Sequence, residues 1–452
     1  MIAGRSIREI AADLSAGRVS AMEVMEESLA AAERTNPTLK SFITIVTSEA
    51  RAQALRSDER RRAHRALSLL DGVPYGAKDL FQTRGIRTTA GSKVLHDWVP
   101  NRSAAVIRQL DNAGATLVGK TNLHEFAYGA TGENEWAGTA VNPHDTNRLA
   151  GGSSSGSAAA VAAGIFPFAL GTDTGGSARV PAALCGIAGF KPSIGRISLE
   201  GAVPFCWSLD HAGILGRTAD DLAIVAECLG VTSVEAIATS LPDRPLRVGI
   251  VPGWAEKSDA SVRRGFDAAR SLLVRSGATF TEVALPNPAE ARTVSLTIQL
   301  AEALTYHGPN LRRAKDSFGP DIHSGLVLGQ FLSAESYIQC KRLVVRYQRE
   351  FHSYFEAVDI LLTPACPVTA PIVGSACVQV GTDTMPIGNA LTLYTSFFNL
   401  VGAPAIVLRT GVNDRGLRVG IQIISCLHDD ARVLGVALLL ERGGLGAVER
   451  PL

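Results

Sequence analysis

Two serines that stand beside glycines are the residues of this chain best suited to catalysis. Ser153 and Ser177 are 24 positions apart, within the glycine-rich segments 151–156 and 175–177. Glycine lets the backbone approach a ligand closely and point its N–H groups at it. A serine hydroxyl becomes a good nucleophile only when a base takes its proton, and Lys78 in the earlier segment 76–79 is a candidate base. The pattern indicates nucleophilic catalysis by a serine.

Three other catalytic motifs are present only in part. Segment 152–156 matches G-x-S-x-G with Ser154 at its centre, but that motif requires a preceding strand and residues 142–148 are turn formers. Asp173-Thr174-Gly175 resembles the triplet of aspartic proteases, yet it occurs once in a chain of this length. His124-Glu125 begins H-E-x-x-H, but Tyr128 takes the place of the second histidine. We therefore expect no nucleophile elbow, no aspartic protease and no metal site.

Composition and charge favour a globular protein that binds a small molecule. Of the 452 residues, 46% are hydrophobic and 19% are charged, which allows a large core. The net charge is +1, and the basic segment 56–65 also contains Asp58 and Glu59, as a solvated helix face does. We expect no nucleic-acid partner, because that would call for a basic patch.

The sequence also bears on localisation. The first 20 residues lack the apolar core of a signal peptide, and the most apolar stretch, 158–170, is short and contains Gly164 and Pro167. The seven cysteines are scattered and odd in number, as expected of reduced core residues rather than a disulfide framework. We expect a cytoplasmic protein with no membrane partner.

Hydrophobic periodicity predicts an α/β fold. Residues 5–63 show the pattern of amphipathic helices, the first capped by Ser6 and the second covering 20–32. After Gly72, short apolar runs alternate with helical stretches, which predicts a mixed or mostly parallel sheet covered on both faces. The apolar runs lie at 116–118, 166–170, 246–251, 359–362, 405–408 and 419–424, and the helical stretches at 103–113, 157–163, 219–228, 260–276 and 429–441.

Taken together, the motifs resemble the amidase signature family. The segments that carry the resemblance are 72–79, 119–122, 142–143, 151–157, 170–179, 181–182, 185–186, 189–196 and 362–364. It covers nearly the whole chain and is strongest over 70–220. Ser155 departs from the pattern, because many members have a glycine there. The resemblance implies a single α/β domain over 1–452, with a helical segment at about 1–65 and the signature core at about 66–220. It also implies that no metal or organic cofactor is needed.

The resemblance assigns a role to each candidate residue. Ser177 would be the nucleophile, Ser153 a bridging serine after a cis peptide bond, Lys78 the base and Ser154 a supporting hydroxyl. The backbone N–H groups of Thr174, Gly175, Gly176 and Ser177 would form the oxyanion hole. Asp173 and Arg179 are expected to pair and brace this loop.

The acyl pocket is harder to assign. Relatives contact substrate at the positions of Ala127 and Tyr128. The candidates for apolar walls are Trp136, Phe205, Trp207, Phe397 and Phe398, and the alternative for each, which we favour when it is taken singly, is an ordinary core residue. The expected substrate is a small carboxamide of the alkyl, aryl, anilide or ureide type.

Two alternative functions remain open within the family. One is the A subunit of a glutamine-dependent aminoacyl-tRNA amidotransferase, whose members hold the carboxylate and ammonium of glutamine with an arginine and an aspartate. By an ungapped comparison those positions are Val344 and Thr392 here, which argues against free glutamine. The other is a non-catalytic binding member, which retention of both serines and the lysine disfavours. A homodimer formed through the apolar face of the N-terminal helices is a further expectation.

Overall fold

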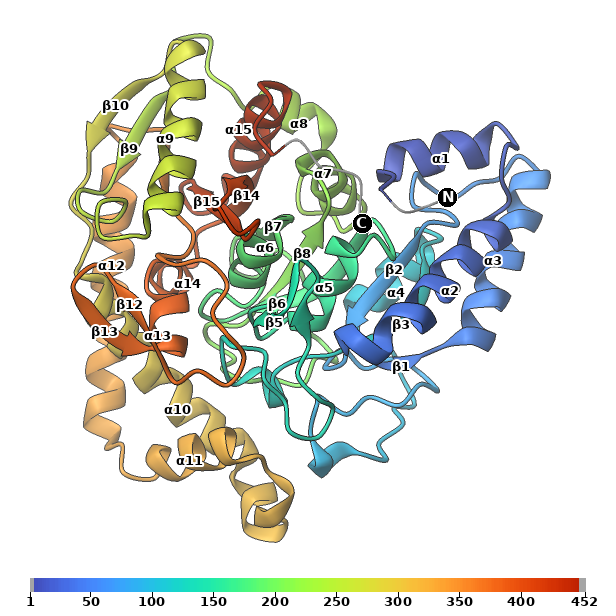
Figure 1. Cartoon of the computed structure of the whole chain (residues 1–452), viewed down its shortest axis with the longest axis horizontal. Coiled ribbons are helices and arrows are strands. Elements are labelled where there is room, and N and C mark those ends of the chain that lie inside the picture. Colours follow the sequence, from blue (N-terminus) through green and yellow to red (C-terminus); the bar gives the residue numbers. More distant parts are fainter. Residues whose placement is uncertain (1–3, 447–452) are drawn as a thin grey trace.

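A central mixed sheet organises the protein, whose computed structural model describes residues 4–446 (Figure 1). Its eleven strands follow the order β1-β3-β2-β6-β8-β7-β14-β15-β11-β9-β10. They are β1 (Phe42–Ile45), β2 (Pro74–Lys78), β3 (Thr116–Thr121), β6 (Phe168–Asp173), β7 (Ala188–Lys191), β8 (His211–Gly216), β9 (Arg247–Ile250), β10 (Thr279–Glu282), β11 (Ile360–Pro364), β14 (Ala405–Val412) and β15 (Arg418–Ile424). β2 runs parallel to β3 and β6, and β9 runs parallel to β10 and β11, whereas the other pairs are antiparallel. The predicted mixed sheet is confirmed.

Helices and two small hairpins complete the fold. The helices are α1 (Ile7–Ser15), α2 (Ala21–Leu39), α3 (Thr47–Arg62), α4 (Ala105–Asn112), α5 (Ser155–Ala162), α6 (Arg179–Cys185), α7 (Ala219–Cys228), α8 (Val234–Ala238), α9 (Ala260–Arg275), α10 (Pro288–Arg313), α11 (Pro320–Gly329), α12 (Ala334–Tyr354), α13 (Ile387–Thr392), α14 (Ser396–Leu400) and α15 (Asp430–Arg442). The hairpins are β4 (Val141–Asn142) with β5 (Asp145–Leu149), and β12 (Cys377–Val380) with β13 (Asp383–Pro386). Each predicted helical stretch and apolar run overlaps an element of the predicted type.

The sheet is covered on both faces, as the sequence predicts. A Cβ atom added at Gly213 of β8 would approach Ala178, at the start of α6, to 2.6 Å, whereas one at Gly216 would approach Leu222 of α7 to 3.0 Å. Side chains alternate along a strand, so these two positions face opposite sides. α5 packs against α6 on one side and α15 packs against α7 on the other. Helices therefore exclude water from both faces.

Two expectations for the N-terminal region need correction. Ser6 caps α1 through a capping box with Glu9, as predicted. However, the segment 1–65 is not wholly helical, because β1 pairs with β3 at the edge of the sheet. The apolar face of α1 is also not free to bind a second copy. Ile7, Ile10 and Leu14 are buried in the core of their own chain, where α1 packs on α7.

The residues before the serine-rich segment form a hairpin rather than plain turns. β5 ends at Leu149, four residues before Ser153, so the expectation of turn formers at 142–148 is wrong. β5 pairs with β4 and forms an isolated antiparallel bridge from Arg148 to Ile372, and it lies outside the central sheet. The nucleophile elbow joins a strand of the central sheet to a helix, so the hairpin does not provide its geometry.

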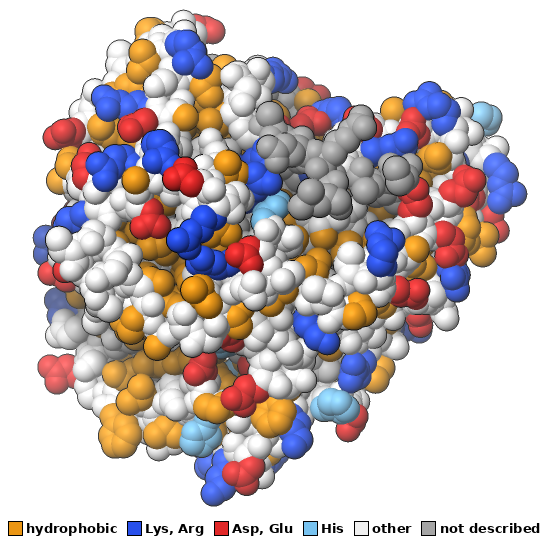
Figure 2. Space-filling model, viewed as in Figure 1, with side chains coloured by type: hydrophobic (Ala, Val, Ile, Leu, Met, Phe, Trp, Pro, Cys, Tyr) orange, Lys and Arg blue, Asp and Glu red, His pale blue; other side chains and the backbone are white. Residues whose placement is uncertain are grey.

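The surface carries mixed charge on the face shown in Figure 2, where basic and acidic side chains are interspersed. In the basic segment 56–65, Arg60 forms an ion pair with Asp71 at 2.6 Å. No helix within residues 4–446 is long and apolar enough to cross a membrane. Among the cysteines expected in the core, Cys185, Cys206 and Cys366 are buried but Cys377 is exposed.

The parallel pairing of β2 with β6 positions the catalytic candidates. Because the two strands run in the same direction, their last residues, Lys78 and Asp173, lie at the same edge of the sheet. α5 begins at Ser155, so Ser153 and Ser154 immediately precede it. In open α/β sheets, the edge at the carboxyl ends of parallel strands is the usual place for ligands.

Candidate active site

Lys78 lies at the centre of a buried cluster of hydroxyl groups. Its Nζ lies within hydrogen-bond distance of Ser153 Oγ at 2.7 Å, Ser154 Oγ at 3.0 Å and Thr172 Oγ1 at 2.7 Å. All four side chains are buried. The peptide bond between Gly152 and Ser153 is cis, as the resemblance implied. The structure thus brings the predicted base and bridging serine into contact, and adds Thr172, which sequence reasoning did not select.

The environment of Lys78 favours its neutral form. Burial lowers the pKa of Lys78 from its ordinary value of 10.5 to about 7, and the charges of Asp210 and Asp173 offset that effect only in part. No carboxylate within residues 4–446 forms an ion pair with the ammonium. A neutral lysine has a free lone pair, so at neutral pH this side chain can accept a proton from a hydroxyl group.

Ser177 joins this cluster through the backbone. Its carbonyl oxygen accepts a hydrogen bond from the N–H of Ser154 at 3.2 Å, which ties the two serine segments together. Ser154 Oγ in turn accepts from Thr172 N and donates to Thr172 O, both at 3.2 Å. Ser177 is 8% exposed, whereas Ser153 and Ser154 are fully buried. Ser177 is therefore the serine of the three that a ligand can reach.

The loop 174–177 presents unused backbone donors. None of its four N–H groups donates a hydrogen bond to another of the described residues. The loop is held instead through acceptors, because the Gly175 carbonyl accepts from Thr395 Oγ1 at 2.6 Å and from Ser396 Oγ at 3.3 Å. Buried N–H groups are rarely left without a partner. These groups are available to a ligand oxygen, as an oxyanion hole requires.

Glycine is required at position 176. Its φ of +134° lies in a region that other residues rarely adopt, and a Cβ atom there would clash with Thr395. On the preceding side, Thr174 Oγ1 donates to Asp210 Oδ1 at 2.6 Å. Burial raises the pKa of Asp210 to about 6. The loop is thus anchored at both ends of its short turn.

A buried ion pair supports the loop from below. The guanidinium of Arg179 donates to Asp173 from Nε at 3.0 Å and from Nη2 at 2.9 Å, so the predicted pairing is confirmed. The same guanidinium donates to Gln422 Oε1 at 3.0 Å and to Asn399 Oδ1 at 2.7 Å. Although burial alone raises the pKa of Asp173, the charge and hydrogen bonds of Arg179 lower it well below its ordinary value. Every donor and acceptor of this pair has a partner, which is the condition for a stable buried ion pair.

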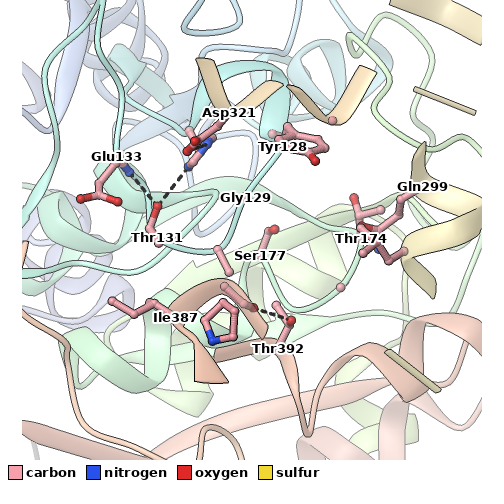
Figure 3. A pocket seen from close by; sticks show the side chains of 18 of the residues that line it. Tyr128, Gly129, Thr131, Glu133, Thr174, Ser177, Gln299, Asp321, Ile387 and Thr392 are labelled. Atoms are coloured by element: carbon pink, nitrogen blue, oxygen red, sulfur yellow. Dashed lines mark hydrogen bonds and ion pairs between the residues drawn. The ribbon is translucent and has the colours of Figure 1, made fainter. Parts of the chain in front are cut away.

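A cavity of about 500 Å³ opens above Ser177 (Figure 3). Of the catalytic and substrate-binding positions selected from the sequence, those that line it are Ala127, Tyr128, Thr174, Gly175, Ser177, Phe205 and Thr392. Lys78 and Ser153 do not line the cavity and are fully buried. A volume of this size suits a small organic ligand.

The other apolar side chains expected in the pocket are placed differently. Trp207 lines an adjoining cavity of about 250 Å³, which shares Ala127, Thr174 and Phe205 with the first. Phe397 and Phe398 are buried in the core and line neither cavity. Trp136 is 42% exposed and also lies outside both. Phe397 and Phe398 are thus the core residues that the alternative described, and Trp136 is neither core nor pocket, because aromatic character alone does not distinguish the two.

Helix α10 supplies pocket residues that sequence reasoning missed. Arg292 and Gln299 both line the cavity, and they are seven positions apart, which places them on one helix face. Arg292 Nε donates to Thr392 Oγ1 at 2.7 Å. Val344, by contrast, is buried on α12 away from the cavity. A helix predicted over α10 would have placed Arg292 and Gln299 on the same face, but it would not have shown that Arg292 contacts Thr392.

No group of three or more His, Cys, Asp or Glu side chains in the described part of the chain is arranged to hold a metal ion. His124 Nε2, from the incomplete zinc motif, lies 3.7 Å from Asp321. Glu125 instead accepts a hydrogen bond from Gly319 N at 2.7 Å. His124 and Glu125 thus contact different residues, Asp321 and Gly319.

The sequence and fold of this chain are similar to those of known proteins. The amidase family profile matches residues 23–434. The chain is 35% identical to AtzE of Pseudomonas sp. (strain ADP), which is a 1-carboxybiuret hydrolase subunit, over 98% of this chain and 99% of that protein. It is also 35% identical to the A subunit of glutamyl-tRNA(Gln) amidotransferase from Coxiella burnetii (strain Dugway 5J108-111), over 96% of both chains. A crystal structure of an amidase matches with a TM-score of 0.90 and 34% identity, covering 97% of this chain and 99% of that one.

The fold is a single α/β domain with a helix-covered mixed sheet, as in the solved amidase structure. The chain belongs to the amidase signature family, and it is an amide-hydrolysing enzyme of that family.

Proposed function

We propose that this protein hydrolyses a small carboxamide to a carboxylic acid and ammonia or an amine, with Ser177 as nucleophile, Ser153 as proton relay and Lys78 as base. The observation that carries the proposal is the contact of 2.7 Å between Ser153 Oγ and the buried Nζ of Lys78, whose pKa is about 7. A lysine with such a pKa can act as a base at neutral pH, and the proton that Lys78 is placed to accept is that of the Ser153 hydroxyl.

The reaction proceeds in two halves. In the first, Lys78 takes a proton from Ser153, Ser153 takes one from Ser177, and the Ser177 oxygen attacks the amide carbon. The negative oxygen that results is stabilised by the free N–H groups of residues 174–177. The C–N bond then breaks, Ser153 gives the proton it took from Ser177 to the departing nitrogen, and Lys78 returns its proton to Ser153. In the second half, Lys78 takes a proton from water through Ser153, the water oxygen attacks the ester on Ser177, and the proton passes back to the Ser177 oxygen as the carboxylic acid leaves.

A role as the A subunit of a tRNA-dependent amidotransferase is the second candidate. The relative from Coxiella burnetii carries that name and is as similar to this chain as AtzE is. Val344 and Thr392 stand where that branch would place its two glutamine-binding charges, which favours hydrolysis of another amide. A non-catalytic role is disfavoured by the intact contacts between Lys78 and the serines.

One experiment tests the proposal directly. The purified chain is incubated with a panel of primary amides, anilides, ureides and glutamine, and release of ammonia or amine is measured. In parallel, a fluorophosphonate probe is applied and its position is mapped by peptide mass spectrometry. We expect turnover of at least one small amide and a label on Ser177. A label on Ser154, or turnover of glutamine alone, would contradict the proposal.

A further inference from the structure

Arg292 is the single Lys or Arg among the described residues that line the 500 Å³ cavity. It projects from the first turns of α10, and its Nε donates to the neutral hydroxyl of Thr392 at 2.7 Å. Its Nη1 is buried and has no hydrogen-bond partner. No carboxylate in the described chain forms an ion pair with it. The cavity wall thus contains a guanidinium that the protein does not neutralise.

Arg179, the fully buried arginine that supports the loop 174–177, is a comparison for Arg292, because its charge is neutralised within the protein. It donates to Asp173, Gln422 and Asn399, and its charge is compensated by the Asp173 carboxylate. A buried charge without such a partner is unfavourable, and burial lowers the pKa of Arg292. Arginine nevertheless keeps its proton in proteins. A guanidinium left incomplete inside a cavity is suited to bind an anion from outside, and its fork matches a carboxylate.

Two segments, α10 and residues 392–396, each extend from Arg292 or its partner Thr392 to the loop 174–177, where the carbonyl group of the substrate would bind. Arg292 and Gln299 are seven residues apart on α10, about 10 Å along the axis. Gln299 Nε2 would contact a Cβ atom on Gly175 at 3.4 Å, so that end of the face adjoins the oxyanion loop. Thr392 and Ser396, four positions apart, likewise connect Arg292 with the loop. Ser396 Oγ donates to Thr392 O at 2.9 Å and to Gly175 O at 3.3 Å. A short ligand can therefore reach both the loop and Arg292.

The charges on the remaining cavity wall lie elsewhere. Glu133 and Asp321 lie on one side of Ser177 and Thr392 lies on the other in the view of Figure 3. Arg292 contacts Thr392, so the end of the cavity near Thr392 has a cation and no carboxylate. An ammonium group held there would be repelled by Arg292. This end suits an anionic group without an amino group beside it.

We propose that Arg292 binds a carboxylate on the substrate, so that the enzyme prefers short amides that carry a carboxylate and lack a neighbouring ammonium. This inference rests on the proposed amide hydrolysis and specifies its substrate class. Arg292 acts here as a specificity-determining residue and takes no part in proton transfer.

Three amides of matched length isolate the two charges. Glutaramate carries the carboxylate, pentanamide replaces it with a methyl group, and glutamine adds an ammonium to glutaramate. We expect kcat/KM for glutaramate to exceed that for either of the others by about 10- to 100-fold, since a charge-assisted hydrogen bond has that effect. Succinamate and butanamide repeat the comparison with a shorter spacer.

Variants of Arg292 supply the second arm. Arg292→Gln should reduce the ratio of kcat/KM between glutaramate and pentanamide to near one, mainly through KM for glutaramate. Arg292→Lys should restore part of it. Arg313→Gln, which removes an exposed arginine from the far end of the same helix, is the matched control and should keep the wild-type ratio.

A binding measurement covers the case in which none of these amides is turned over. Glutarate is titrated into Ser177→Ala by calorimetry, and Arg292→Gln in that background should weaken its binding by at least about 10-fold. Hydrolysis of neutral amides with no preference for the anionic ones overturns the role of Arg292 while leaving amide hydrolysis intact. Glutarate binding that ignores Arg292 overturns it as well. Absence of any hydrolysis together with no label on Ser177 counts against the proposed function itself.

Discussion

The Nζ atom of Lys78 lies 2.7 Å from the Oγ atom of Ser153, and both side chains are fully buried. The lysine enters from the end of β2 and the serine from the segment before α5, so the contact depends on the sheet that holds these elements together. Burial lowers the pKa of Lys78 to about 7, so the amine is able to accept a proton from the serine. A proton can therefore pass from the hydroxyl to the amine at neutral pH.

Replacing Ser177 with alanine should abolish amide hydrolysis. Of the three clustered serines, Ser177 is the one that lines the cavity, so neither Ser153 nor Ser154 can replace it as nucleophile. Steady-state ammonia release and fluorophosphonate labelling both measure the loss. Ser154→Ala is the comparison, because it should retain the label at Ser177. Wild-type turnover by Ser177→Ala would contradict the assignment.

Activity should rise with pH through a limb centred near pH 7. Lys78 is protonated below its pKa of about 7 and is a base above it, so kcat/KM increases as the pH passes that value. Lys78→Ala should lower the rate by about 10²- to 10⁴-fold and remove the limb.

Lys191 offers a matched control for that pH profile. Burial also lowers its pKa to about 7, but its ammonium donates to the carbonyl oxygens of Pro192 and Ala403 rather than to a serine. Lys191→Met should therefore keep the limb. A limb that survives in Lys78→Ala and disappears in Lys191→Met would reassign the titrating base.

Ser153→Ala should be impaired, but less completely than Ser177→Ala. The variant removes the hydroxyl between Lys78 and the nucleophile, and a water molecule in the vacated space can relay the proton in part. We expect kcat to fall while labelling of Ser177 by the fluorophosphonate persists at a reduced rate. Equal and total loss of labelling in both variants would show that Ser153 does more than relay a proton.

The Asp173–Arg179 pair should contribute strongly to stability. Asp173→Asn leaves the fully buried guanidinium without its anion, which is expected to cost about 3–5 kcal/mol in the free energy of unfolding. Denaturation in urea measures the loss, and Glu350→Gln, in an exposed pair with Arg346, should change it by less than about 1 kcal/mol. The pKa of Asp173 lies well below its ordinary value of 3.8, so this stabilisation is present above about pH 4 and is lost as the pH falls further.

The purified chain should hydrolyse a small amide without tRNA, ATP or glutamine. The Arg292 end of the cavity has a cation for a carboxylate but no anion for the ammonium of glutamine, so glutaminase activity should be marginal. Ammonia release measured with and without these additives decides the point. A strong preference for glutamine, or co-purification with proteins that act on tRNA, would favour the amidotransferase role.

The sequence by itself determined much of the local structure and the identity of the catalytic candidates. Periodicity of apolar residues predicted α7 and six of the eleven strands of the central sheet, because each of these elements carries its pattern within a few consecutive residues. Ser153, Ser177 and Lys78 were found from residue types, spacing and resemblance. β2 escaped notice, since Pro74–Lys78 is short, contains a glycine and is buried throughout, and so shows no alternation.

Only the tertiary structure decided which residues meet. Arg292 contacts Thr392 across 100 positions of sequence, and Arg179 contacts Gln422 across 243. The sequence around Arg292 or Arg179 does not predict which residue it contacts, because such contacts depend on how whole helices and strands pack together. The same holds for Ile7 and Ile10, whose apolar face suggested a dimer until α7 was seen to cover it. Local sequence specifies elements, whereas burial and long-range packing specify the charge and partners of each side chain.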